Sequence, residues 1–142
     1  IIDSSVYPLF KKMLFKFCDD KNIEIQEILR GCLNLTYYTP VHEFVDPHVD
    51  HPFETWSVLM YLNEFSNGET LIFNEQYGKD GWDETVYSAF DIKKFQDFGS
   101  FRIKKMITPK KGKIVGFYGS YFHSAKWCLP SERRIVCVFT FK

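Results

Sequence analysis

The sequence predicts a mainly β domain, a β-sandwich or barrel-like roll, preceded by one helical region at its N-terminal end. An amphipathic helical pattern occurs only near the start of the chain, between residues 4 and 20. About seven short apolar segments follow it, separated by turn signals such as Asn67-Gly68. At 142 residues the chain is long enough to bury one hydrophobic core but short for a second, so we expect a single domain over 1–142.

The helix is predicted over residues 4–20, where apolar side chains recur at spacings of three and four. They are Val6, Leu9, Phe10, Met13, Leu14 and Phe17. Ser4 or Ser5 is a suitable N-cap, and Pro8 is tolerated in the first turn. Residues 23–29 remain ambiguous between strand and helix. We therefore interpret residues 1–30 as a helical support region and residues 31–142 as the β core.

Strands are predicted in the order 32–38, 56–62, 70–73, 101–107, 114–118 and 134–141, with a further β-rich run leading to His123. Asn67-Gly68 is a strong hairpin signal, so residues 70–73 are expected to return beside residues 56–62. Residues 76–100 are rich in Gly, Asp and aromatic residues and show no clear period. They are predicted to form an insertion or lid, where substrate contacts are often found.

Charge and cysteine content exclude several classes of function. Eighteen basic and eighteen acidic residues give a net charge of zero, so neither nucleic acid nor an anionic membrane is an expected partner. No apolar run approaches the roughly 20 residues that span a bilayer. The four cysteines form no Cys-x-x-Cys pair and are predicted to be buried free thiols, which favours an intracellular, cytoplasmic location.

The segment Asp46-Pro-His-Val-Asp50 is a candidate metal-binding motif. If a strand carries His48 and Asp50, its period of two places both side chains on one face, where they can share one metal ion. His123 could supply a third ligand. Two histidines and one carboxylate leave coordination positions open, which suits ferrous iron in oxygenases.

Two other histidines compete for this role. His42 and His51 lie beside the motif, but loop histidines are usually exposed to solvent. His51 is the stronger rival.

Six segments in this order resemble the Fe(II)/2-oxoglutarate-dependent oxygenases and, within them, the prolyl 4-hydroxylase-like branch. The resemblance spans residues 33–141 and rests on Tyr38, ten residues before His48; residues 47–50; residues 57–63; residues 67–73; residues 108–117; and His123 followed by Arg133. This chain has Asn67-Gly68 where relatives usually have two glycines. Where many relatives have Gly before the basic residue, this chain has Ser131-Glu-Arg-Arg134, so two arginines compete for one position.

The resemblance implies a double-stranded β-helix, or jelly roll, with iron held at one open end by His48, Asp50 and His123. Further residues are implied to bind the cosubstrate 2-oxoglutarate: Arg133 and Tyr61 at its distal carboxylate, and Tyr38 along its pocket. Arg133 and Arg134 face opposite sides of a strand, and the spacing from His123 favours Arg133. Tyr37 competes with Tyr38 in the same way, and family spacing favours Tyr38.

The implied activity is that of a dioxygenase that uses Fe(II), 2-oxoglutarate and O2, with ascorbate as a reductant, to hydroxylate a C–H bond. A prolyl residue in a peptide or protein is the first expected substrate. A free amino acid or another small molecule is the alternative, and a nucleic acid ranks lower because the chain is neutral. A catalytically inactive jelly-roll binding module would require a broken metal triad or a missing arginine, and the sequence contains neither defect.

Overall fold

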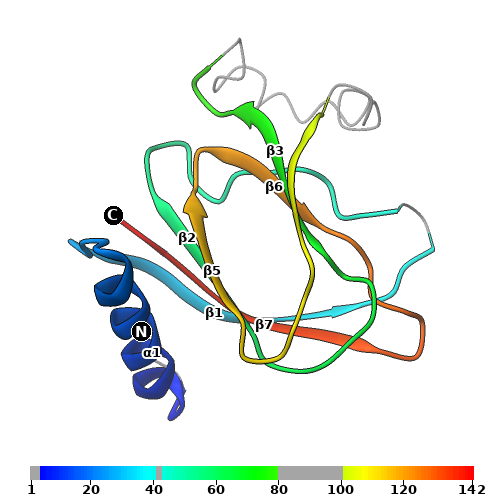
Figure 1. Ribbon diagram of the computed structural model, residues 1–142, viewed down its shortest axis with the longest axis horizontal. Coiled ribbons are helices and arrows are strands. Elements are labelled where there is room, and N and C mark those ends of the chain that lie inside the picture. The colour runs from blue at the N-terminus through cyan, green and yellow to red at the C-terminus, as the bar shows by residue number, and fades with distance from the viewer. Residues whose placement is uncertain (1–3, 41–42, 80–100) are drawn as a thin grey trace.

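The computed structural model describes residues 4–40, 43–79 and 101–142, and in these ranges one helix precedes seven strands (Figure 1). The elements are α1 (Tyr7–Lys21), β1 (Ile28–Tyr37), β2 (Trp56–Tyr61), β3 (Thr70–Gln76), β4 (Ile103–Ile107), β5 (Ile114–Tyr118), β6 (Tyr121–Ala125) and β7 (Arg133–Phe141). The ambiguous segment before Cys32 is thus partly strand, because β1 begins at Ile28. Most of the predicted insertion, residues 80–100, lies outside the described residues.

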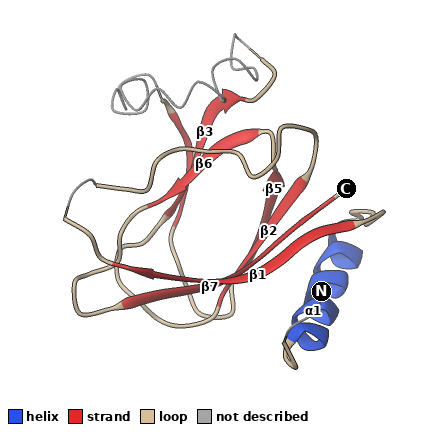
Figure 2. Cartoon of the chain, turned by 180° about the vertical axis from the view of Figure 1, so that it is seen from behind, coloured by secondary structure: helices blue, strands red, loops and turns tan. Residues whose placement is uncertain are grey.

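The strands form two antiparallel sheets, with the orders β1-β7-β2-β5 and β4-β3-β6. Beside β6 runs the chain segment that carries His48, which makes the isolated antiparallel bridges Phe44↔Lys126 and His48↔His123. This segment occupies the place of an eighth strand, and consecutive segments alternate between the two sheets around a common interior except at β3 and β4, which are neighbours in one sheet (Figures 1 and 2). The arrangement is a double-stranded β-helix, which confirms the predicted mainly β jelly roll.

β7 shows how the core is divided. Val136 and Val138 point between the sheets, where a cluster also contains Leu59, Tyr61, Ile72 and Phe117. The alternate residues Cys137 and Phe139 point to the opposite face and join a second cluster beneath the helix. Because β7 is a central strand with both faces covered, its residues from Val136 to Phe141 are all buried.

α1 covers the outer face of the four-stranded sheet (Figure 2). Its buried residues, Leu14 and Cys18, lie one turn apart and pack against sheet residues such as Val58. The helix ends at Lys21 and is capped by Asn22, whose φ of 53° is left-handed. At the other end the N-cap is Val6, and the predicted cap residue Ser4 instead accepts a hydrogen bond from the Val6 N–H at 3.3 Å.

β2 and β3 do not form the predicted hairpin. β2 pairs with β5 and β7, whereas β3 pairs with β4 and β6 in the other sheet. Asn67 and Gly68 do adopt left-handed backbone angles, φ 57° and 68°, as their turn signal predicts. Residues 62–69 nevertheless form a longer connection that crosses between the sheets. The local signal located the turn correctly but not the partner of the returning strand.

All four cysteines are free, as predicted, and Cys18, Cys128 and Cys137 are buried, whereas Cys32 is only half-buried. The only helix in the described ranges is α1, and neither its length nor its hydropathy would allow it to cross a bilayer.

Candidate metal centre

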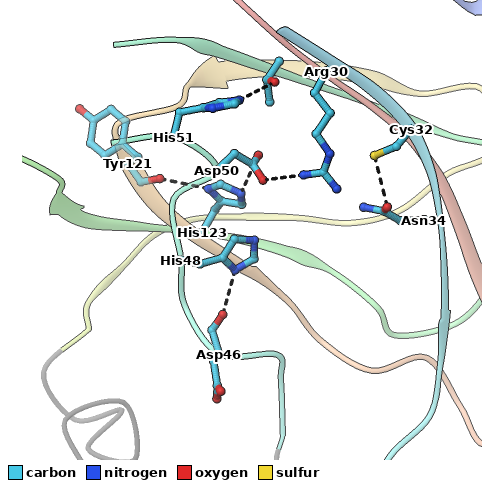
Figure 3. A network of polar contacts seen from close by, with 10 residues as sticks. Arg30, Cys32, Asn34, Asp46, His48, Asp50, His51, Tyr121 and His123 are labelled. Carbon is cyan, nitrogen blue, oxygen red and sulfur yellow. Dashed lines mark hydrogen bonds and ion pairs between the residues drawn. The ribbon is translucent and has the colours of Figure 1, made fainter. Parts of the chain in front are cut away.

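The structure brings His48, Asp50 and His123 together, with one ligand atom from each lying within 4.8 Å of the others (Figure 3). His123 belongs to β6, and His48 lies opposite it. The two backbones bond reciprocally: His48 N–H donates to the His123 carbonyl at 3.0 Å, and His123 N–H donates to the His48 carbonyl at 2.9 Å. Asp50 follows two residues later on the same side. The predicted strand around His48 is wrong in extent, because the segment makes isolated bridges only.

Both imidazole rings are oriented by backbone carbonyls. The Nδ1 atom of His48 lies 2.9 Å from the Asp46 carbonyl oxygen, and that of His123 lies 3.1 Å from the Tyr121 carbonyl oxygen. A carbonyl only accepts hydrogen bonds, so Nδ1 must carry the proton in each ring. The lone pair is then on Nε2, which is the arrangement that metal-ligating histidines commonly show.

The charges of the centre also suit a metal. Burial lowers the pKa of His48, and the neighbouring His123 lowers it further, which favours the neutral imidazole that a metal requires. Burial alone would raise the pKa of Asp50. When no metal occupies Nε2 of His123, the hydrogen bond and charge of its protonated ring, with smaller effects of His48 and Arg30, outweigh that burial and lower the pKa of Asp50 to about 2. Asp50 is therefore ionised at neutral pH.

These residues fit a divalent transition metal. Two neutral imidazole nitrogens and one carboxylate oxygen converge without a fourth protein ligand among the described residues. This donor set is the facial triad that holds non-haem Fe(II) with open positions. His51 is outside the set, since its Nε2 atom lies 2.8 Å from the Thr140 hydroxyl, and His42 lies outside the described residues.

A cavity of about 150 Å³ adjoins the centre between the sheets. It is lined by Asn34, Thr36, Val45, His48, Asp50, Leu59, Thr70, His123, Ser124, Ala125, Arg134, Val136 and Val138. Pockets for drug-sized ligands usually measure about 300–1,000 Å³, so this cavity suits a smaller metabolite.

Arg134, and not Arg133, faces this cavity, so the predicted register was wrong by one residue. Arg134 is 4% exposed and lines the cavity, whereas Arg133 is exposed. The ladder between β1 and β7 accounts for the difference. It pairs Arg134 with Thr36, another cavity residue, and Arg133 with the exposed Tyr37. The guanidinium carbon of Arg133 lies over the Tyr37 ring, 5.9 Å from the ring centroid.

Arg134 is buried without a carboxylate partner among the described residues. Its Nε donates to the Gly68 carbonyl at 3.2 Å, and its Nη2 donates to the Thr70 hydroxyl at 3.0 Å. Burial lowers the pKa of Arg134, but a guanidinium stays charged in proteins. The cavity therefore contains a fixed positive charge whose two hydrogen-bond acceptors are neutral.

The two tyrosines predicted to contact the cosubstrate have different positions. Tyr61 is buried, and its hydroxyl lies 2.7 Å from the Thr70 hydroxyl, so it reaches the same polar cluster as Arg134. Burial raises the pKa of Tyr61, partly offset by Thr70 and Arg134, which keeps the phenol protonated. Tyr38 is 43% exposed and does not line the cavity, so its predicted position is wrong. From β1, Asn34 and Thr36 face inward instead.

Sequence reasoning missed Thr70, Asn34 and Thr36. Thr70 lies directly after Asn67-Gly-Glu69, and its position immediately before the apolar run Leu71-Ile-Phe73 was a usable signal. Asn34 and Thr36 alternate with apolar residues along β1, so the pattern correctly indicates two faces. It suggests that the polar face is the outer one, and the structure has the opposite orientation: Leu33 and Leu35 are exposed.

No protein-family model and no curated protein matches the chain. Among solved structures, it is similar to the crystal structure of an oxidoreductase of the 2OG-Fe(II) oxygenase family from Burkholderia pseudomallei, with a TM-score of 0.63 and 15% sequence identity. The match covers 99% of this chain and 58% of that protein, so this chain spans a little over half of its length. At this identity the similarity shows a shared fold.

Proposed function

We propose that the protein is an Fe(II)- and 2-oxoglutarate-dependent dioxygenase that hydroxylates a C–H bond. One observation carries the proposal: the His48–Asp50–His123 set and the buried guanidinium of Arg134 open into the same cavity. A site for a divalent metal beside a site for a carboxylate is what a metal-chelating dicarboxylate needs. The fold shared with a 2OG-Fe(II) oxygenase family protein agrees with this reading.

When bound, Fe(II), 2-oxoglutarate and dioxygen supply the chemistry, in which oxidative decarboxylation to succinate and CO2 is coupled to hydroxylation of the substrate. The chain would hold the metal through the Nε2 atoms of His48 and His123 and a carboxylate oxygen of Asp50. The two backbone carbonyls at Asp46 and Tyr121 keep the rings in the required tautomer.

The cosubstrate would be oriented by the polar cluster at the other end of the cavity. Arg134 would pair with the distal carboxylate, because a guanidinium fork matches a carboxylate bidentately. The Tyr61 hydroxyl, 2.7 Å from that of Thr70, would donate to Thr70, which leaves the Thr70 hydroxyl, a cavity-lining group, free to donate to the same carboxylate. An anion there would offset the cost of burying Arg134 without a charged partner.

A prolyl residue in a peptide or protein is the first substrate to test, because of the resemblance to the prolyl 4-hydroxylase-like branch. A free amino acid or another small molecule is the alternative within the same chemistry. An inactive jelly-roll binding module is disfavoured, because the metal set is assembled and a buried arginine is in place.

The decisive experiment incubates the protein with Fe(II), ascorbate and 2-oxoglutarate and measures succinate. We expect slow succinate formation without a prime substrate, none from His123→Ala, and little from Arg134→Ala at limiting 2-oxoglutarate. Arg133→Ala is the matched control and should resemble the unchanged protein. If the iron-loaded protein makes no succinate with or without candidate substrates, the binding-module reading replaces the proposal.

Prolyl peptides and free amino acids are then compared by mass spectrometry for the gain of one oxygen atom. Faster succinate formation together with a hydroxylated peptide would support the prolyl assignment. Coupling only to a free amino acid would support the small-molecule alternative.

A further inference from the structure

β1 is irregular where it approaches the candidate metal centre. Its ladder with β7 shifts between Ile28 and Arg30, which leaves Leu29 as the extra residue of a β-bulge. A bulge breaks the simple alternation of side chains and re-aims them. Ile28 packs against the cluster under α1 on the outer face, yet Arg30, two residues later, turns inward to Asp50. Arg30 has the same phase as Cys32, Asn34 and Thr36, which also face inward, so the bulge re-aims Ile28 while Arg30 continues the inward row toward the centre.

Arg30 contacts one oxygen of Asp50 and leaves the other for the histidines. Its Nη1 donates to Asp50 Oδ1 at 3.2 Å, whereas Asp50 Oδ2 lies 3.5 Å from His123 Nε2 (Figure 3). The Asp50 side chain is 10% exposed and that of Arg30 is 46% exposed. Arg30 therefore lies at the rim of the centre, on the side of Asp50 that faces away from His123.

His51, the residue after Asp50, contacts the four-stranded sheet beside Arg30. His51 Nε2 lies 2.8 Å from the hydroxyl of Thr140, and Thr140 is the cross-strand partner of Arg30. Two paired residues of the four-stranded sheet, Arg30 and Thr140, therefore contact two consecutive residues, Asp50 and His51. Within the described ranges, the last bridge from this segment to β6 is at His48, so Asp50 depends on these ties across the interior.

We propose that Arg30 is a positioning residue for the metal centre: by holding Oδ1 of Asp50 it presents Oδ2 to the site and sets the metal affinity without being a ligand. The inference rests on the proposed function and goes beyond it, since it concerns a residue outside both the ligand set and the cosubstrate cavity. Partners that hydrogen-bond a ligating carboxylate fix its orientation, and their loss commonly weakens metal binding about 10–100-fold.

The test is a titration of Co(II) into the metal-free protein, followed by the d–d absorption of the bound ion. Arg30→Gln should raise the dissociation constant about 10–100-fold. It should also change the spectrum at saturation, because Asp50 becomes free to rotate. Arg30→Lys retains the charge and should recover part of the affinity. Arg133→Gln, on an exposed side chain, should bind Co(II) like the unchanged protein.

The thermal unfolding midpoint of each metal-free variant shows whether it is folded. If Arg30→Gln is unfolded, the Co(II) affinity of Arg30→Lys decides the test. A folded Arg30 variant that binds Co(II) with unchanged affinity and spectrum would overturn the inference while leaving the proposed function intact. If His123→Ala also binds Co(II) as the unchanged protein does, then the metal centre itself is refuted and the proposed function fails with it.

Discussion

Arg134 and Thr70 join the two sheets across the interior: the Nη2 atom of Arg134, on β7, donates to the Oγ1 atom of Thr70, on β3, at 3.0 Å. The Thr70 hydroxyl also lies 2.7 Å from the Tyr61 hydroxyl. Three polar side chains thus meet between the sheets, and none of the ion pairs among the described residues involves Arg134. Such a cluster is costly unless an anion completes it.

The first prediction concerns this cluster. Arg134→Ala should weaken 2-oxoglutarate binding by about 2 to 5 kcal/mol, or roughly 30-fold to several thousand-fold, because a buried carboxylate loses its partner. The 2-oxoglutarate affinity of Arg134→Lys should lie between those of the unchanged protein and Arg134→Ala, since lysine keeps the charge but lacks the two-pronged guanidinium. Calorimetric titration of 2-oxoglutarate measures the effect. Arg133→Ala is the control, and a larger loss from it than from Arg134→Ala would contradict the observed register.

The second prediction concerns Asp50. Asp50→Ala should abolish hydroxylation and metal retention while the domain stays folded, because removing a rim carboxylate opens no cavity in the core. Arg30 then loses its partner but is exposed enough to be solvated. Metal content, product mass and the thermal unfolding midpoint are the three measurements. Product formation by a metal-loaded Asp50→Ala variant would refute the ligand role.

The third prediction concerns the core beneath the three-stranded sheet. Leu71 is fully buried, at 0% exposure, in a cluster with Phe73 and Phe122, whereas Leu9 on α1 is 59% exposed. Leu71→Ala should lower the free energy of unfolding by about 2–5 kcal/mol through the cavity it leaves. Leu9→Ala should change it by no more than about 0.5 kcal/mol. Urea unfolding compares the two variants, and equal losses would mean that the packing described here is incorrect.

The fourth prediction follows from Cys137. Burial, together with the nearby Cys32, raises the pKa of the Cys137 thiol from 9.0 to about 11. Between these values the folded state keeps a proton that the unfolded state has lost, so folding becomes less favourable as the pH rises. The free energy of unfolding should therefore fall more steeply from pH 9 to pH 11 in the unchanged protein than in Cys137→Ala. Parallel curves would show that this thiol titrates alike in both states.

Local sequence patterns were sufficient for the order of elements and for two residues of the metal set, His48 and Asp50. The helical stripe, the strand segments and the turn at Asn67-Gly68 are all short-range signals, and the structure contains each of them. His48 and Asp50 lie two residues apart, so any extended backbone presents them together. The pairing with His123 came from the resemblance in spacing, and the structure places it within reach.

Only the tertiary structure decided which side chains point inward in strands that are covered on both faces. The local sequence does not show what covers each face of such a strand. β7 has the helix on one face and the other sheet on the opposite face, so apolar residues fill both and no alternation indicates which arginine turns inward. The pairing of Arg134 with Thr36 on β1 settles it. Arg30 likewise faces Asp50 because it lies in the inward row of β1 with Asn34 and Thr36, and that row is set by the register between two strands far apart in the sequence.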